Sequence, residues 1–197
     1  MSMNLTLLLP DDGKVYDMIC EFLGANWYAV AGTLVLAAGV VVHIVYATML
    51  TLQNRKARGS DKYLSSNRTE TEWSAKNMYV LGLIIVLGLV IHLWNFWYKM
   101  QFAELIGCPD AVTGGSGLVK ELFSSPCYAI VYLIWLGAIW FHLTHGVWSA
   151  FQTLGLSGKI WYPRLKMISN IVSTLIVVGF AAIPVYFMAV HLLCGNN

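Results

Sequence analysis

Four long stretches without any Asp, Glu, Lys or Arg constrain the fold of this chain more than any other feature. An α-helix rises about 1.5 Å per residue, so about 20 apolar residues cross a hydrocarbon core of about 30 Å. Each of the four stretches is longer than that, and they cover residues 22–54, 77–98, 122–158 and 167–197. The sequence therefore predicts four membrane-spanning helices.

The composition agrees with a protein that lies mostly in a membrane. Of the 197 residues, 58% are hydrophobic and 11% are charged, and the mean hydropathy is +0.65. The N-terminal run is too short, and lacks the basic start, for a cleaved signal peptide. The net charge of +2 argues against a nucleic-acid partner. We therefore expect an all-α membrane protein with a single domain over residues 1–197, a bundle of four transmembrane helices at about 27–53, 77–99, 127–154 and 167–193.

The basic residues predict the orientation of this bundle. Segments 55–76 and 159–166 carry nine Lys and Arg residues, whereas segments 1–26 and 99–121 carry three. Cytoplasmic loops hold the excess of Lys and Arg in membrane proteins. The first two segments are therefore expected in the cytoplasm. The aromatic belt at the outer surface would then contain Trp27, Tyr28, Trp94, Trp97 and Tyr98.

Three histidines, His43, His92 and His142, lie deep inside three of the charge-free stretches. An unpaired polar group in hydrocarbon costs on the order of several kcal/mol, so ionisable side chains at this depth usually serve a function. Neutral imidazole is a common metal ligand, and in a helical bundle the strongest candidate partner is haem iron. A histidine hydrogen-bonded to a neighbouring helix is the alternative, which explains one histidine more readily than three.

The depths of these histidines indicate two levels in the membrane. His43 and His142 lie about 15 and about 18 Å from the cytoplasmic ends of helices that run in the same direction. His92 lies about 10 Å from the outer end of an oppositely directed helix. We therefore expect an inner pair, His43 with His142, and a single outer histidine.

A small residue stands one helical turn before each of the three histidines. Residues four apart share a helix face, so a flat macrocycle could lie against the helix at these positions. Small residues are also common wherever membrane helices pack closely. The three residues are Gly39, Gly88 and Ala138.

Two further histidines are alternative ligands. His145 lies on the same helix face as His142, and depth in the membrane alone does not decide which of the two is the ligand. His191 lies at the outer end of the last helix, with the bulky Phe187 one turn before it. That position favours an ordinary interfacial histidine.

The cysteines all fall at or beyond the outer ends of the expected helices. An oxidising outer compartment would permit two disulfides, with Cys108–Cys127 the simplest pair, but the spacings suit free thiols equally. The sequence contains no Cys-x-x-Cys motif, no glycine-rich phosphate loop and no Ser/His/Asp arrangement near the histidines. We expect no active site of the soluble type. The four cysteines are Cys20, Cys108, Cys127 and Cys194.

Four motifs together resemble a known family. The most specific is a His-x-x-x-Gly-x-aromatic pattern, Phe141-His142-Leu-Thr-His145-Gly146-Val-Trp148. The others are His43-Ile-Val-Tyr-Ala before a basic loop, Gly88-x-x-x-His92-x-Trp94, and Cys20-Glu21-Phe22-Leu-Gly-Ala-Asn-Trp-Tyr. Over essentially the whole chain they resemble the cytochrome b subunit of succinate dehydrogenase/fumarate reductase, in its single-subunit form with two haems.

The resemblance implies which histidines bind iron. The His-x-x-x-Gly-x-aromatic pattern selects His142 over His145 as a ligand. In the family, the histidines that match His142 and His43 bind the same haem b, on the cytoplasmic side. His92 matches a ligand of the outer haem. Two axial imidazoles leave no open iron position, which suits electron transfer.

One departure from the family concerns its first helix. The family has five transmembrane helices, and the four expected here resemble its second to fifth. Met1-Ser-Met-Asn-Leu then resembles the end of a first helix, so that the recorded start is too late or the gene is truncated. The outer ligand that pairs with His92 would stand just upstream. We expect one fully ligated haem b in this chain and two in a full-length family member.

The resemblance also implies a function within a complex. The subunit anchors a flavoprotein and an iron–sulfur protein to the bacterial inner membrane and passes electrons between them and a membrane quinone, most often menaquinone. Trp73 and Tyr63 in the basic segment are candidate contacts for the iron–sulfur partner. Glu21 is a candidate for proton exchange with the quinone, with an ordinary interfacial carboxylate as its alternative. Some members carry a proton-transferring glutamate where this chain has Trp140.

Other protein classes would use the histidines differently. A haem-free helical anchor or small transporter could use them for packing or for metal binding. A transporter is expected to show paired carboxylates or broken helices at mid-membrane. Here Pro184 alone interrupts a helix core, and no acidic residue lies within one. The cytochrome b of another quinone-linked enzyme would share the haem but not the pattern that begins at His142.

Overall fold

The computed structural model describes residues 1–58 and 72–194, and every regular element among them is helical. Four helical segments within these ranges are long and apolar enough to cross a membrane. The predicted all-α bundle of four transmembrane helices is therefore confirmed. The segments are α3 (Trp27–Arg58), the continuous run α5 (Met78–His92), η2 (Leu93–Phe102) and α6 (Ala103–Leu105), α8 (Pro126–Thr153), and α9 (Trp161–Cys194).

The helices extend beyond the apolar stretches that predicted them. The starts expected at 27, 77 and 127 lie within one residue of the observed starts, but α3 continues to Arg58 and α9 begins six residues before the expected 167. Backbone hydrogen bonds hold a helix together, so a helix continues through charged residues that lie outside the hydrocarbon. Pro163 does not interrupt α9, because a proline in the first turn of a helix breaks no helical hydrogen bond.

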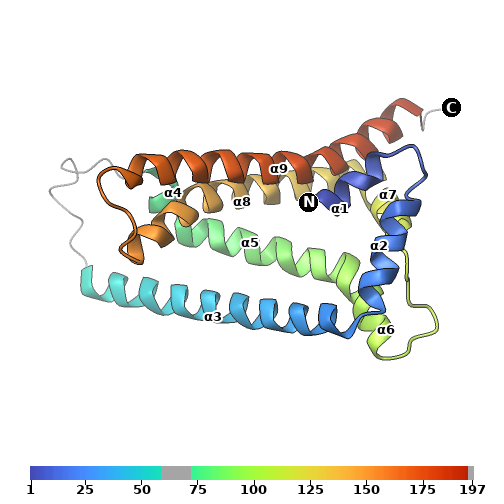
Figure 1. Ribbon diagram of the computed structural model, residues 1–197, viewed down its shortest axis with the longest axis horizontal. Coiled ribbons are helices and arrows are strands. Elements are labelled where there is room, and N and C mark those ends of the chain that lie inside the picture. The colour runs from blue at the N-terminus through green and yellow to red at the C-terminus, as the bar shows by residue number, and fades with distance from the viewer. Residues whose placement is uncertain (59–71, 195–197) are drawn as a thin grey trace.

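Five short helices in the described ranges lie outside the predicted spans, because none is long or apolar enough to cross a membrane. Two of them, α2 and α7, lie across one end of the bundle (Figure 1). We call this end the capped end and the opposite end, where α3 ends and α9 begins, the basic end. The short helices are α1 (Ser2–Leu5), η1 (Thr6–Leu8), α2 (Lys14–Gly24), α4 (Trp73–Lys76) and α7 (Ser116–Ser124).

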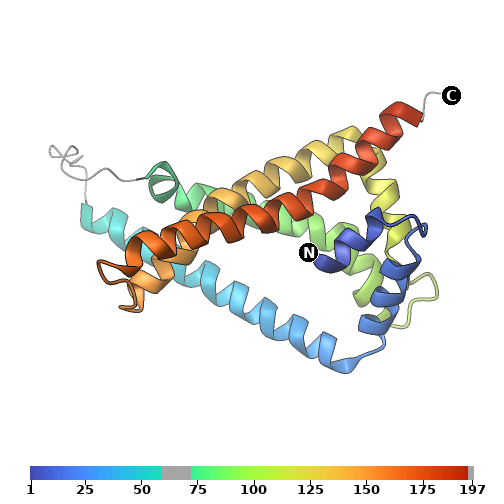
Figure 2. The ribbon, with the colours of Figure 1, turned by 45° about the horizontal axis from the view of Figure 1, so that its top comes forward.

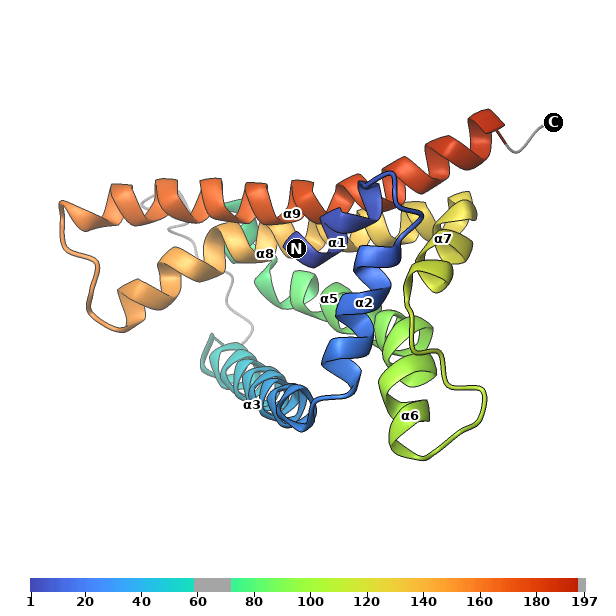
Figure 3. The ribbon, with the colours of Figure 1, turned by 45° about the vertical axis from the view of Figure 1, so that its right-hand side comes forward.

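The long helices are unevenly packed. Helices α8 and α9 run side by side and share the most extensive interface, and α5 packs against α8 (Figure 2). Helix α3 stands apart from α8 and α9, and α2 joins it to the rest at the capped end (Figure 3). No residue in the most apolar part of α3 is buried by protein, whereas the other three spans are each partly buried. The space beside α3 is therefore the place to look for a ligand.

Two small polar residues allow α8 and α9 to approach closely. Ser169 and Ser173 on α9 have almost no exposed surface and stand one turn apart. The Ser169 hydroxyl donates to the carbonyl oxygens of Leu143 and Thr144 at 3.1 and 3.0 Å. Small residues and interhelical hydrogen bonds of this kind replace the hydrophobic driving force that membrane helices lack.

A glycine brings α5 and α8 together. Gly88 on α5 is buried, and the indole of Trp135 on α8 occupies the position that a side chain at residue 88 would need. The Trp135 Nε1 donates to the carbonyl oxygen of Ile85 at 3.0 Å. Gly88 therefore serves helix packing, the alternative role of a small residue in a membrane helix, and Trp135 occupies the place where a macrocycle could lie.

Replacing Gly88 by alanine should destabilise the protein, because the added methyl group overlaps Trp135. Overpacking of this kind costs about 1–3 kcal/mol. The thermal midpoint of the detergent-solubilised protein should fall. Gly137→Ala on α8 is the matched control, because its methyl group meets open space, and its midpoint should stay the same or rise. Equal midpoints for the two variants would contradict this close contact.

Two polar contacts link α2 to α7 at the capped end. The Asp17 carboxylate accepts hydrogen bonds from the backbone N–H and hydroxyl of Ser116, at 2.8 and 2.6 Å, and so caps the first turn of α7. Lys120 forms an ion pair with Asp12, and the Lys120 ammonium holds the pKa of that carboxyl below its ordinary value. Buried side chains from four helices pack behind these contacts: Tyr16, Phe123, Tyr132 and Phe187.

Residues 1–5 lie against α9. They form α1, which packs on α9 with the Met1 side chain against Gly179.

Three cysteines at the capped end are free thiols, namely Cys20, Cys108 and Cys127. The structure thus bears out the free-thiol alternative for these three cysteines.

Candidate functional site

A large cavity lies between α3, α5 and α8 in the described part of the chain. Its volume is about 860 Å³, within the usual range for a site that holds a cofactor or other large ligand. We call it the inner cavity. Three of the five histidines of the chain line it, namely His43 on α3 and His142 and His145 on α8.

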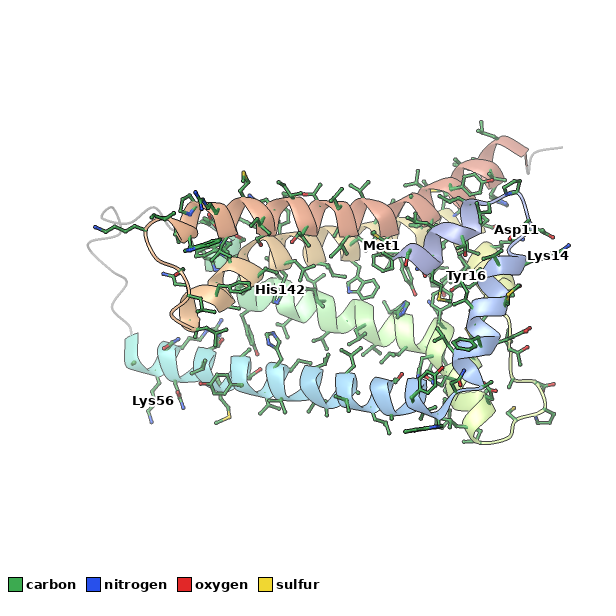
Figure 4. All side chains as sticks on the ribbon, viewed as in Figure 1. Met1, Asp11, Lys14, Tyr16, Lys56 and His142 are labelled. Atoms are coloured by element: carbon green, nitrogen blue, oxygen red, sulfur yellow. The ribbon has the colours of Figure 1, made fainter. Side chains whose placement is uncertain are left out.

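The structure brings His43 and His142 together across this cavity. Their ring centroids are 6.1 Å apart, and the ring planes differ by 77°. Two imidazoles on opposite sides of one metal ion would have centroids about 6 Å apart, from a metal–nitrogen distance of about 2 Å on each side. The observed separation therefore fits a pair of axial ligands. In Figure 4 the His142 side chain extends from α8 toward α3.

The His142 ring also has an unpartnered polar atom. Its Nδ1 is buried and has no hydrogen-bond partner within residues 1–58 and 72–194, although such a group costs about 1–3 kcal/mol when buried alone. Binding of the opposite ring nitrogen to a metal would fix the tautomer and place the remaining N–H on Nδ1. Such binding would leave the Nδ1–H donor unpaired as well, so the buried Nδ1 atom does not by itself favour ligand binding over packing.

Glycines leave room beside the two rings. A side chain at Gly39, one turn before His43, or at Gly146, one turn after His142, would meet no neighbouring atom. A Cβ atom placed on Gly82 of α5 would lie 4.0 Å from the Cε1 atom of His142. Ala138 is buried and does not line the cavity. Of the small residues that precede the two histidines, Gly39 lines the cavity and Ala138 does not, and on α8 it is Gly146 that lines it.

His145 has a different environment from His142. Its Nδ1 lies 3.2 Å from Glu72 Oε2, and the other carboxylate oxygen of Glu72 is paired with Lys166. Lys166 and His145 hold the pKa of the Glu72 carboxyl below its ordinary value. His145 therefore already has an ionic partner, whereas His142 has none among the described residues.

His92 lies in a second, smaller cavity near the capped end. This outer cavity has a volume of about 300 Å³ between α2, α3 and η2, and no other histidine of the described chain lines it. The His92 ring packs against Phe96, Tyr132 and Trp135, with centroids 5.2, 6.2 and 5.5 Å away. Its Nδ1 is also buried, and no described residue forms a hydrogen bond with it. The π-helical turns of η2 begin directly after His92, and such turns are frequent at functional sites.

The remaining candidate residues lie outside both cavities. Glu21 is exposed on α2, and Glu104 rather than Glu21 lines the outer cavity. His191 is exposed at the capped end of α9. The Trp140 Nε1 donates to Thr174 Oγ1 at 2.9 Å, which ties α8 to α9. Tyr63 lies outside the described residues.

Comparisons of this chain with known protein families, curated proteins and solved structures find no match. The functional argument therefore rests on the residues of the two cavities. Among the described residues, no three His, Cys, Asp or Glu side chains form a group that could hold a metal ion. A haem differs from such a site, because its iron takes four ligands from the porphyrin and two from the protein.

Gly82 and Tyr79 of α5 line the inner cavity and were not predicted from the sequence. The contact of His145 with Glu72, the residue before α4, was not predicted either. Glu72 is separated from His145 by 73 residues, so no local pattern indicates this contact. Gly146 belongs to the motif that selected His142, and its lack of a side chain was the available signal.

Proposed function

We propose that this chain is the haem b-binding membrane subunit of a succinate:quinone oxidoreductase or fumarate reductase. The observation that supports the proposal best is the pair of His43 and His142, which face each other across the inner cavity at 6.1 Å. The motif resemblance supports the same pair. A haem held by two imidazoles transfers one electron at a time and has no open position for oxygen or substrate.

The protein residues hold and shield the cofactor in this proposal. His43 and His142 serve as axial ligands from α3 and α8, and Gly39, Gly82 and Gly146 leave space for a flat ring between the helices. Apolar side chains of α3 and α5 line the rest of the cavity and exclude water. We propose one fully ligated haem, at the inner cavity. An outer haem on His92 would require Trp135 to leave the face of Gly88.

The proposal includes partners at the basic end, which the distribution of Lys and Arg places in the cytoplasm. A flavoprotein and an iron–sulfur protein would dock there and exchange electrons with a membrane quinone through the haem. Trp73 on α4 is 58% exposed at this end and packs on Phe141 with ring centroids 5.2 Å apart. We propose that it contacts a partner there.

Purification from native bacterial membranes in a mild detergent tests this function. A flavoprotein and an iron–sulfur protein should co-purify, and the complex should couple succinate or fumarate to a quinone. Trp73→Ala should weaken this association, because truncating an exposed aromatic anchor at an interface typically costs at least about 2 kcal/mol. Trp27→Ala, at the capped end and 79% exposed, should leave it intact.

Isolation as a stable oligomer without such partners would contradict the proposal. If that oligomer also lacked haem, the alternative of a haem-free anchor or small transporter would replace it. If it contained haem, the cytochrome b of another quinone-linked system would be the better assignment.

A further inference from the structure

The inner cavity is apolar at one end and polar at the other. Toward the capped end its walls are apolar side chains of α3 and α5 together with Trp135, whose N–H is already bonded to Ile85. Toward the basic end it is lined by hydroxyl groups and an imidazole. These polar residues are Thr48, Thr51, Tyr79, His145 and Ser149. A ligand that fits this cavity therefore has one polar edge, directed toward the basic end.

A cation stands over the polar end. The Arg55 guanidinium lies above the ring of Tyr79, with its Cζ atom 5.8 Å from the ring centroid, so it bridges from α3 to α5. Helical side chains point back toward the N-terminus of their helix. From Arg55 this direction leads toward Thr51 and the cavity. The neighbouring Lys56 points away from α5 and α8 (Figure 4).

Glu72 is the described carboxylate at this end of the cavity, and it is already paired. The Glu72 carboxylate lies between His145 and Lys166, and it has contacts to both. It therefore compensates the charge of Lys166 rather than that of Arg55. Among the described groups around the polar end, Arg55 is left as a cation without an acidic partner. The polar edge of the ligand should accordingly be anionic.

We propose that Arg55, with the hydroxyl groups at this end of the inner cavity, binds the two propionate carboxylates of the haem and so fixes its orientation. This inference rests on the proposed function, because it requires that His43 and His142 hold a haem. Guanidinium suits the task, since its planar set of N–H donors matches a carboxylate and stays charged at any physiological pH. Thr51 already donates to the Ala47 carbonyl at 2.8 Å, so it would bind a propionate only by sharing or redirecting that proton.

Binding of haem and of haem dimethyl ester to the full chain in detergent tests the inference. The ester has the same ring and iron but no carboxylates. The wild-type chain should prefer haem to its ester, and Arg55→Gln should bind haem about tenfold or more weakly, as expected for a lost charge-assisted hydrogen bond. Its binding of the ester should not change. The midpoint potential of the bound haem should fall, because a nearby positive charge favours the reduced iron.

Lys56→Gln is the matched control, because it removes the same charge from the next residue of α3. It should preserve the preference for haem. Arg55→Lys keeps the charge but loses the planar donor set, so it should lose part of the preference, and it provides the test if Arg55→Gln aggregates.

Equal binding of haem and ester by the wild type, or an unchanged preference in the soluble Arg55 variants, would overturn the inference and leave the proposed function standing, provided that the bound haem has two histidine ligands. Absence of any haem binding to the wild type would overturn both.

Discussion

Replacing His142 by alanine should abolish the low-spin, bis-imidazole haem signal, and His43→Ala should do the same. The two rings lie 6.1 Å apart on different helices, and His145, the other histidine that lines the cavity, is already bonded to Glu72. Loss of either ligand leaves iron with one imidazole at most, which changes both its spin state and its affinity. Electron paramagnetic resonance and the reduced-minus-oxidised optical spectrum of the purified variants measure this.

His145→Ala and His191→Ala are the controls. His145 is held by Glu72, and His191 is exposed at the capped end of α9, so both variants should keep the low-spin signal. The opposite pattern, with the signal kept in His142→Ala and lost in His145→Ala, would move the ligand one turn along α8. Such a result would require the contact between His145 and Glu72 to break.

Gly39→Leu should prevent haem binding without unfolding the protein. Residue 39 faces the inner cavity one turn before His43, and nothing lies within contact distance of a Cβ atom placed there. A leucine side chain at this position therefore enters the space in which a ring would lie. The haem content of the purified variant should fall to background, and its circular dichroism should remain helical.

Ala37→Leu is the control for this substitution. Ala37 lies on the same helix, is exposed and does not line the inner cavity, so a leucine there should face lipid. Its haem content should match the wild type. A full complement of haem in Gly39→Leu would show that the ring does not lie against α3 at this position.

The sequence predicts the membrane-spanning part of this fold well, for a simple physical reason. Backbone groups in hydrocarbon must bond within their own segment, so an uncharged stretch of sufficient length has to be a helix. That constraint does not apply outside the hydrocarbon core, because water can form hydrogen bonds with the backbone there. Helices α2 and α7 lie outside it, and they depend on contacts such as that between Asp17 and Ser116, which are 99 residues apart in the chain.

The candidate site is only partly predictable from the sequence. Helix rise and direction place His43 and His142 at one depth, and the structure puts them in one cavity. The same reasoning leaves two roles open for Gly88, since small residues serve helix packing as well as ligand binding, and the structure shows helix packing. A helical pattern shows on which face of its helix a residue lies. It does not show which residue from another segment packs against that face. Trp135 is that residue for Gly88, and Glu72 is that residue for His145.

The central claim is that His43 and His142 bind one haem between α3 and α8. The most direct test is the spectrum of the purified wild-type chain, taken oxidised, reduced, and reduced in the presence of carbon monoxide. Two histidine ligands predict a low-spin b-type haem at one equivalent per chain whose reduced spectrum carbon monoxide does not change, because no coordination position is open. A chain without haem, or a haem that is high-spin and binds carbon monoxide, would contradict the claim.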